Sequence, residues 1–344
     1  MKTVKQIGKI VLGLVIIAGL FIGFKVGYAY YSSYQDLKSL DNTVLAAELT
    51  ASEIARGESL TDGEILYKRP IDLSTIEPLW KKIADNDTLK ANFKYLDALN
   101  FFSVVYKSDS LLVNGIFAEP KEDGEFPVII FNRGGNKKVG KESRMSTLFS
   151  LILSSSAQVA KEGYVILAPC YRENDKFGGR DINDVLNLIK TAEYLPKANV
   201  ARLGMMGWSR GGMMTYLSLK RPGLIKTAVV VNGPTDLQPL LTERPEMEMV
   251  CHQLIPNYSE NKEEELQKRS VVYWTEELDK NASLLILCGT EDEQVNPNQA
   301  HKIADRLAAI EYDYTLREFK TDHKFTGKSE ELSKLLIDWF DTTL

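Results

Sequence analysis

Ser209 is the residue of this sequence best placed to act as a nucleophile. It lies at the centre of the motif Gly207-Trp208-Ser209-Arg210-Gly211, between the apolar run 203–206 and a helix-like run that begins at 211. A serine on such a strand-to-helix turn adopts a strained backbone conformation that exposes its hydroxyl, and glycines flank it because side chains there would collide with neighbouring backbone. The spacing alone is a weak signal. Its position between a strand and a helix favours a nucleophile elbow over a simple structural turn.

A serine hydroxyl needs a histidine to accept its proton and a carboxylate to hold that imidazole in one tautomer. The sequence contains three histidines. On this kind of turn the serine is followed along the chain by the acid and then by the histidine. His252 comes too early for that order, and His301 lies inside an expected helix, 297–310. His323 follows an expected strand, 314–319, in a polar loop, and we therefore predict that His323 is the base.

The acid should follow the strand that precedes the helix 297–310. The apolar run 284–287 leads into a loop with three carboxylates, Glu291, Asp292 and Glu293. Only one of three neighbouring side chains can point at the imidazole. The residue types and their spacing leave the choice among them open.

Strand-like and helix-like runs alternate along most of the chain, and their order predicts how these loops are held. Three strands separated by turn signals come first, at 101–106, 111–118 and 126–131. After them the expected helices are 145–162, 182–195, 211–220, 297–310 and 330–344, and the expected strands are 164–168, 202–206, 226–231, 284–287 and 314–319. This order predicts an α/β fold with a mostly parallel central sheet, helices on both faces and antiparallel N-terminal edge strands. The stretch 237–280 interrupts the alternation and is expected to form a helical cap.

The N-terminal hundred residues divide into two further regions. Three lysines, Lys2, Lys5 and Lys9, precede an apolar run that extends to residue 31. We expect residues 1–31 to be a membrane anchor, with a cleaved signal segment or a buried core helix as alternatives. We expect residues 32–100 to form a stalk and a helical lead-in, and residues 101–344 to form the catalytic domain. Because lysines precede the apolar run, the catalytic domain is expected outside the cytoplasm, tethered to the cell membrane or, after signal cleavage, secreted.

Composition excludes several other classes of protein. The net charge is -5, and no basic stripe is present, which argues against nucleic acid as a partner. Cys170, Cys251 and Cys288 are too far apart for a zinc knuckle or a disulfide framework, and Cys170 and Cys288 each end an apolar run, as buried thiols do. We expect no metal or organic cofactor, because no set of His, Cys and Asp has ligand spacing. No repeat of about 20 to 50 residues occurs, so no propeller is expected within this chain.

Taken together, the motifs resemble the catalytic domain of the prolyl oligopeptidase family, which has the α/β-hydrolase fold. The resemblance rests on the segments 207–212, 269–270, 289–295 and His323, and covers about 101–344. It implies that the acid is the aspartate of the family's G-T-x-D pattern, which is Asp292 here. The intervals of 83 residues from Ser209 to Asp292 (292 minus 209) and of 31 from Asp292 to His323 (323 minus 292) also resemble those of the family.

Catalysis also requires N–H donors for the oxyanion. The backbone N–H of Arg210, which follows the nucleophile, is one candidate. The loop 132–136 resembles the family's H-G-G turn and implies Gly135 as the second donor, with Gly134 as the alternative. Three residues depart from the family pattern, which often has His or Tyr at Arg133, His at Cys288 and Gly at Lys324.

These features predict a serine hydrolase that cleaves an ester or a peptide/amide bond through an acyl-enzyme on Ser209. The expected substrate is a small ester or a short peptide, and the resemblance favours a peptidase. A carboxylesterase would use the same residues. In a different class, a catalytically inactive, membrane-tethered binding module is a further alternative.

Overall fold

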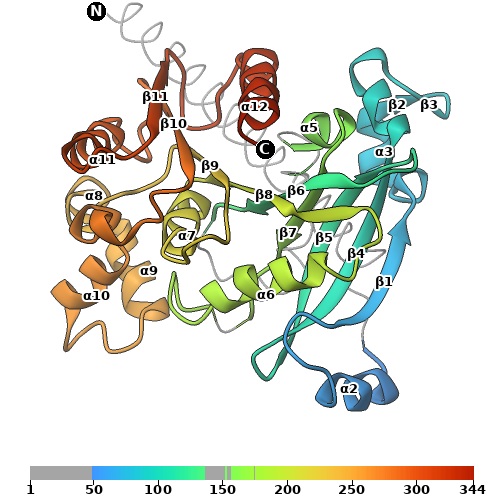
Figure 1. The fold of residues 1–344 in the computed structure, drawn as a ribbon, viewed down its shortest axis with the longest axis horizontal. Helices are drawn as coiled ribbons and strands as arrows, with labels where there is room; N and C mark the ends of the chain where they lie inside the picture. The colour runs from blue at the N-terminus through green and yellow to red at the C-terminus, as the bar shows by residue number, and fades with distance from the viewer. Residues whose placement is uncertain (1–48, 136–151, 153–155, 174) are drawn as a thin grey trace, which may run out of the picture.

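A nine-stranded sheet forms the centre of the molecule (Figure 1). The computed structural model describes residues 49–135, 152, 156–173 and 175–344. In spatial order the strands are β1 (Ile65–Ile71), β4 (Leu99–Ser108), β5 (Leu111–Pro120), β7 (Val165–Pro169), β6 (Phe126–Asn132), β8 (Ala198–Trp208), β9 (Thr227–Val231), β10 (Ser283–Gly289) and β11 (Tyr314–Phe319). From β7 to β11 all neighbours are parallel, whereas the pairs β1–β4, β4–β5 and β5–β7 are antiparallel. The predicted α/β-hydrolase architecture is therefore confirmed.

Helices cover both faces of this sheet, as Figure 1 shows. One hydrophobic core joins the sheet to α6 (Ile182–Ala192), α7 (Arg210–Ser218) and α11 (Asn298–Ala309). A second core, on the opposite face, joins it to α5 (Ala157–Lys161) and α12 (Ser329–Thr343).

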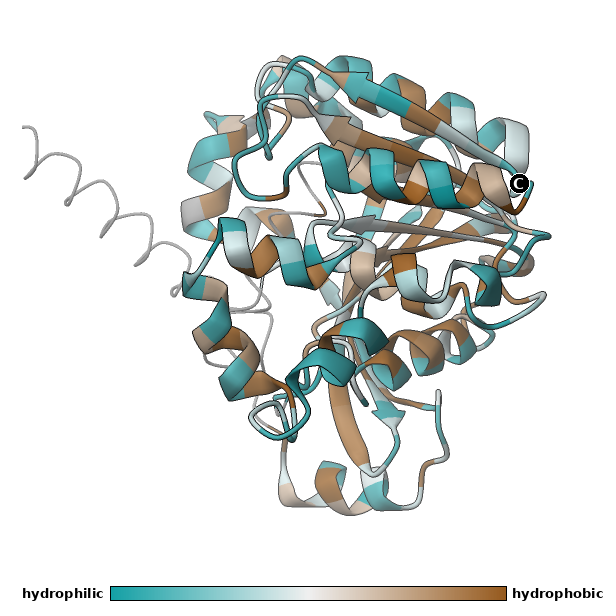
Figure 2. Ribbon diagram, turned by 90° about the vertical axis from the view of Figure 1, so that its left-hand side faces the viewer, coloured by the Kyte–Doolittle hydropathy of each residue, from teal (hydrophilic) through white to brown (hydrophobic). Residues whose placement is uncertain are grey.

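The central strands are mostly apolar because both of their faces are buried. In β6, Val128 and Ile130 belong to the first core, and Ile129 and Phe131 belong to the second. Figure 2 shows the same contrast between largely hydrophobic central strands and covering helices that mix hydrophobic and hydrophilic residues. This arrangement is typical of a parallel sheet with helices on both sides.

The interruption predicted at 237–280 is a helical insertion between β9 and β10. It consists of α8 (Leu237–Glu243), α9 (Glu246–Leu254), α10 (Lys262–Lys268) and the short 3₁₀ turns Val271–Tyr273 and Thr275–Glu277. Its apolar side chains, such as Leu240 and Leu254, extend the first core. Arg269, directly after α10, donates hydrogen bonds from its guanidinium to the carbonyl oxygens of Phe177 (2.7 Å) and Lys176 (3.1 Å). The insertion is thereby fixed to the loop that follows β7.

Residues 32–100 contribute a strand to the sheet as well as helices. This range supplies the edge strand β1. It also contains α2 (Ala51–Glu58), α3 (Glu77–Ile83), the 3₁₀ segments Leu73–Thr75 and Ala91–Ala98, and the small hairpin of β2 (Ala84–Asp85) and β3 (Thr88–Leu89). The expected segment 1–31 lies outside the described residues. Within the described part of the chain, no helix has the length and apolar character needed to span a membrane.

Candidate active site

Ser209 occupies a sharp turn between β8 and α7. Its φ of 55° and ψ of -125° lie in a region that L-residues rarely adopt, so the backbone here is strained. The strained turn is held by two backbone hydrogen bonds, in which the N–H of Ser209 donates to Val231 O (2.8 Å) and the N–H of Gly212 donates to Ser209 O (2.8 Å). These bonds offset the strain and keep the serine side chain at the carboxyl end of the sheet.

The two motif glycines are required by close backbone packing. A Cβ on Gly207 would lie 2.1 Å from the carbonyl oxygen of Gly211, and a Cβ on Gly211 would lie 1.9 Å from that of Asn132. Both contacts are with backbone, which cannot move aside as a flexible side chain can. The elbow geometry expected from Gly-x-Ser-x-Gly is therefore present.

His323 and Asp292 form a buried pair. His323 Nδ1 lies 2.7 Å from Asp292 Oδ2, and the Asp292 side chain is completely inaccessible to solvent. The other carboxylate oxygen, Oδ1, accepts the backbone N–H groups of Gln294 (2.7 Å) and Val295 (3.0 Å). Glu291 and Glu293, the alternatives that the sequence left open, are exposed. The geometry thus brings Asp292, and neither glutamate, against the imidazole.

Two side chains tie the His323 loop to the strand ends beside Ser209. Trp208 Nε1 and Asn232 Nδ2 both donate to the carbonyl oxygen of His323, each over 3.1 Å. Asn232 Oδ1 in turn accepts the N–H of Gly289, at the start of the acid loop (2.9 Å). The loops of all three candidate triad members are therefore linked directly.

Asn232 was not singled out by the sequence analysis. It has a φ of 48°, which asparagine tolerates better than most residues, and it is buried. The available signal was a polar residue directly after the apolar strand 227–231. Asp322 was also missed; its Oδ1 accepts the N–H groups of Lys324 (3.1 Å) and Thr326 (2.9 Å) and closes the turn that carries His323.

The remaining two histidines are exposed. His252 Nε2 lies 2.9 Å from Ser259 Oγ, and His301 Nε2 lies 2.9 Å from Glu318 Oε1. Both have local polar partners. This agrees with their sequence-based assignment as residues outside the triad.

Two of the residues considered for the oxyanion hole, Arg210 and Gly134, lie next to Ser209. Arg210 is the first residue of α7, where a backbone N–H has no acceptor within the helix. Gly134 packs against the nucleophile, since a Cβ there would lie 3.1 Å from Ser209 Cβ. Gly135 follows with a φ of 85°, a conformation that favours glycine. The next residues of this loop lie outside the described part of the chain.

The Arg210 side chain forms an ion-pair cluster beneath the elbow. Its guanidinium donates to both oxygens of Asp175 (2.6 Å each) and to Asp181 Oδ2 (2.8 Å). Burial alone would raise the pKa of Asp175, but the charge of Arg210 and its hydrogen bonds lower that pKa to about 2. No local pattern in the sequence indicates this cluster, because Arg210 lies about 30 residues from the two aspartates along the chain.

Burial disfavours the reactive thiolate form of the cysteines. All three cysteines are buried, and burial raises the pKa of Cys251 to about 11 and that of Cys288 to about 12. Among the described residues, no group of three His, Cys, Asp or Glu side chains could hold a metal ion.

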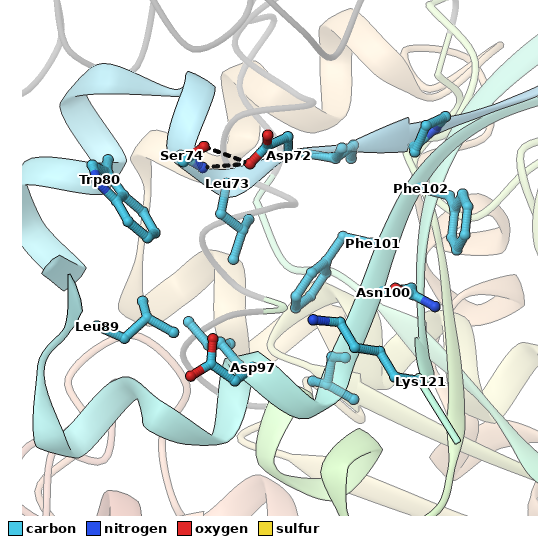
Figure 3. A pocket seen from close by; sticks show the side chains of 14 residues that line it. Asp72, Leu73, Ser74, Trp80, Leu89, Asp97, Asn100, Phe101, Phe102 and Lys121 are labelled. Atoms are coloured by element: carbon cyan, nitrogen blue, oxygen red, sulfur yellow. Dashed lines mark hydrogen bonds between the residues drawn. The ribbon is translucent and has the colours of Figure 1, made fainter. Parts of the chain in front are cut away.

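Figure 3 shows a separate cavity, between the lead-in and β4, which is lined in part by Leu73, Trp80 and Phe101. Its volume is about 250 Å³. None of the candidate triad residues lines that cavity.

Comparison with known proteins gives relatives of two kinds. A curated relative, the uncharacterized peptidase YtmA of Bacillus subtilis (strain 168), is 24% identical over 250 residues, covering 70% of this chain and 93% of YtmA. Among solved structures, the Pyrococcus horikoshii acylaminoacyl peptidase has a TM-score of 0.60 and 23% identity, covering 74% of this chain and 43% of that one. Esterase B from Lactobacillus Rhamnosis has a TM-score of 0.57 and 15% identity, covering 72% and 86%. At these identities the solved structures show a shared fold, and the chain spans less than half the length of the acylaminoacyl peptidase.

The family comparison is more specific. The sequence profile of the prolyl oligopeptidase family matches residues 157–344, which is 188 of the 344 residues (344 minus 157 plus 1). The matched range contains the elbow, the acid loop and the His323 loop. The chain therefore belongs to the prolyl oligopeptidase family of serine peptidases.

Proposed function

We propose that this serine hydrolase cleaves short peptides by acyl transfer to water, with Ser209 as nucleophile, His323 as base and Asp292 as its orienting acid. The observation that carries the proposal is the buried 2.7 Å contact between His323 Nδ1 and Asp292 Oδ2. It leaves Nε2 of the same ring as the nitrogen that can exchange a proton with Ser209.

In the first step His323 Nε2 takes the hydroxyl proton while Ser209 Oγ forms a bond to the substrate carbonyl carbon. The backbone N–H groups of Arg210 and Gly135 stabilise the negative oxygen. As the intermediate collapses, the bond to the leaving group breaks and His323 donates its proton to the departing amine or alcohol. Water then attacks the acyl-enzyme with His323 again as base, which releases the acid and restores Ser209.

A peptide substrate is supported by family membership and by the relatives, which include proteins described as peptidases. Carboxylester hydrolysis is the second candidate, and the likeness to esterase B over most of that chain supports it. Both reactions proceed through the same residues. They differ in leaving group, since an amine requires protonation by His323 more strictly than an aryl alcohol does.

A fluorophosphonate probe tests the nucleophile. We expect it to label the wild-type enzyme at one site and to leave Ser209→Ala unlabelled. Ser218→Ala, which replaces a buried serine at the end of α7, is a matched control that should keep labelling. Equal labelling of wild type and Ser209→Ala would refute the assignment. Folded wild-type protein that takes no label would instead support an inactive binding module. Parallel assays with acyl-peptide amides and p-nitrophenyl esters then distinguish the two substrate classes.

We also propose that residues 1–31 tether the enzyme to the cell membrane with its catalytic domain outside the cytoplasm. The support is the sequence itself, with Lys2, Lys5 and Lys9 ahead of the apolar run. Full-length protein should resist extraction from membranes by alkaline carbonate and should be degraded by protease added to intact cells. A shortened, soluble product would instead indicate signal cleavage.

A further inference from the structure

Arg133 stands at the start of the oxyanion loop and is one of the three residues at which this sequence departs from the family pattern that it resembles. The residue is only 6% exposed, and its guanidinium bonds the backbone of its own loop. Nη1 donates to the carbonyl oxygen of Gly134 (2.9 Å), and Nη2 donates to that of Cys170 (3.0 Å). The guanidinium carbon also lies 4.8 Å from the centroid of the Tyr171 ring. A cation is therefore held in a fixed position against the backbone of the loop.

The acceptor at Gly134 determines where the next N–H points. The carbonyl of Gly134 and the N–H of Gly135 belong to one planar peptide group, in which a trans bond directs them to opposite sides. When Arg133 holds the carbonyl oxygen, the N–H of Gly135 must point away from the guanidinium. Gly134 is also the residue that packs against Ser209 Cβ. The constrained peptide therefore lies next to the nucleophile.

The charge of Arg133 is less neutralised locally than that of its neighbour Arg210. Arg210 Nη1 contacts the carbonyl oxygen of Gly135 (3.3 Å), but this guanidinium is paired with two aspartates. Both acceptors of Arg133 are neutral carbonyl oxygens. A cation on a carbonyl oxygen polarises the peptide and makes its N–H a stronger donor.

We propose that Arg133 is a positioning residue that orients and polarises the Gly134–Gly135 peptide so that the Gly135 N–H stabilises the oxyanion. The inference rests on the proposed acyl-transfer function. It gives the departure from the family pattern at this position a specific role in transition-state stabilisation.

The test compares wild type, Arg133→Ala and Arg133→Lys on a peptide amide. Loss of one oxyanion donor costs about 100-fold or more in kcat in comparable sites, so Arg133→Ala should lose about that much with KM nearly unchanged. Arg133→Lys keeps the charge but cannot bond both carbonyls in the fork geometry, and it should lose less. A peptide trifluoromethyl ketone forms an oxyanion on Ser209. Its inhibition constant should rise by about the same factor as kcat/KM falls. Added guanidinium ion should partly restore kcat in Arg133→Ala.

Arg172→Lys is the matched control. Arg172 is also a buried arginine near β7, but it pairs with Asp184 (2.7 Å) and Asp109 (2.9 Å). Its substitution should therefore lower stability without selectively lowering the affinity for the ketone. If both Arg133 variants keep wild-type kcat and ketone affinity, the proposal is overturned while the triad assignment stands. A rise in KM with kcat unchanged would also overturn the proposal. If Arg133→Ala does not fold, Arg133→Lys alone decides. If wild type is itself inactive and unlabelled, it is the proposed function that fails.

Discussion

Replacing Asp292 with Asn changes one charge in the buried pair while preserving much of its geometry. Asp292 Oδ1 accepts the N–H groups of Gln294 and Val295, and the amide oxygen of Asn can accept both. The amide nitrogen then takes the place of Oδ2, 2.7 Å from His323 Nδ1. Because an amide nitrogen donates, Nδ1 must become an acceptor, which moves the imidazole proton to Nε2. In that tautomer His323 cannot take the proton of Ser209.

The expected loss follows from this change of tautomer. The same substitution in another serine protease lowers kcat by about 10⁴, and an effect of that size corresponds to about 5 kcal/mol of activation free energy. Stability should change little, because Asn fills the same volume and keeps the two backbone hydrogen bonds. We therefore expect Asp292→Asn to melt within about 4 °C of the wild type.

The assay is steady-state hydrolysis of a peptide amide at neutral pH, with thermal melting of each variant. Glu291→Gln and Glu293→Gln are matched controls, because each removes one carboxylate from the same loop but at an exposed position. Both should retain kcat close to the wild-type value. The reasoning would be refuted if Asp292→Asn folded normally and stayed fully active, or if either glutamine variant showed the large loss.

Three other outcomes follow from single contacts. Gly211→Ala should lower the free energy of unfolding by about 3 kcal/mol or more in chemical denaturation, since its Cβ would overlap the carbonyl oxygen of Asn132; an unchanged midpoint would contradict the packing. Activity should survive alkylating reagents at neutral pH. Burial, and to a smaller extent nearby carboxylates, raise the pKa of the Cys288 thiol to about 12, so it stays protonated. Rapid inactivation would show an accessible thiol. Burial raises the pKa of Asp175, but Arg210 outweighs burial and lowers that pKa to about 2. The ionised Asp175 therefore stabilises the fold above its unfolded pKa of about 4, and this stabilisation is lost as the pH falls from 4 through 2. Asp175→Asn should flatten that part of the profile of unfolding free energy against pH and reduce stability at neutral pH.

The parallel part of the sheet could be predicted because burial on both faces leaves a local signature. The apolar runs 126–131 and 284–287 correspond to β6 and β10, whose ends differ from the predicted ones by at most two residues. The helix expected at 297–310 is α11. For the helix expected at 145–162, the structure describes only its C-terminal part, which includes α5; residues 145–151 and 153–155 lie outside the described residues.

The edge strand β1 had no comparable signature. It contains Lys68, Arg69 and Pro70, which are typical of an exposed sheet edge and unusual in a central strand. Its extended conformation follows from pairing with β4, about 35 residues later in the chain. Such a non-local interaction cannot be read from a window of neighbouring residues. The same limit applies to the Arg210 cluster and to the two hydrogen bonds of Arg133.

The topology explains why the candidate triad tolerates a long insertion between its members. Ser209 follows β8, Asn232 follows β9 and the Asp292 loop follows β10, and these three parallel strands are direct neighbours that end at the same edge of the sheet. The insertion 237–280 leaves after β9 and returns before β10, but the N–H of Asn232 still donates to the carbonyl oxygen of Leu287 (2.8 Å). The distance from elbow to acid is thus set by strand pairing and is independent of the length of the insertion. Evolution or engineering can therefore change the helices α8 to α10 without moving Asp292 relative to Ser209.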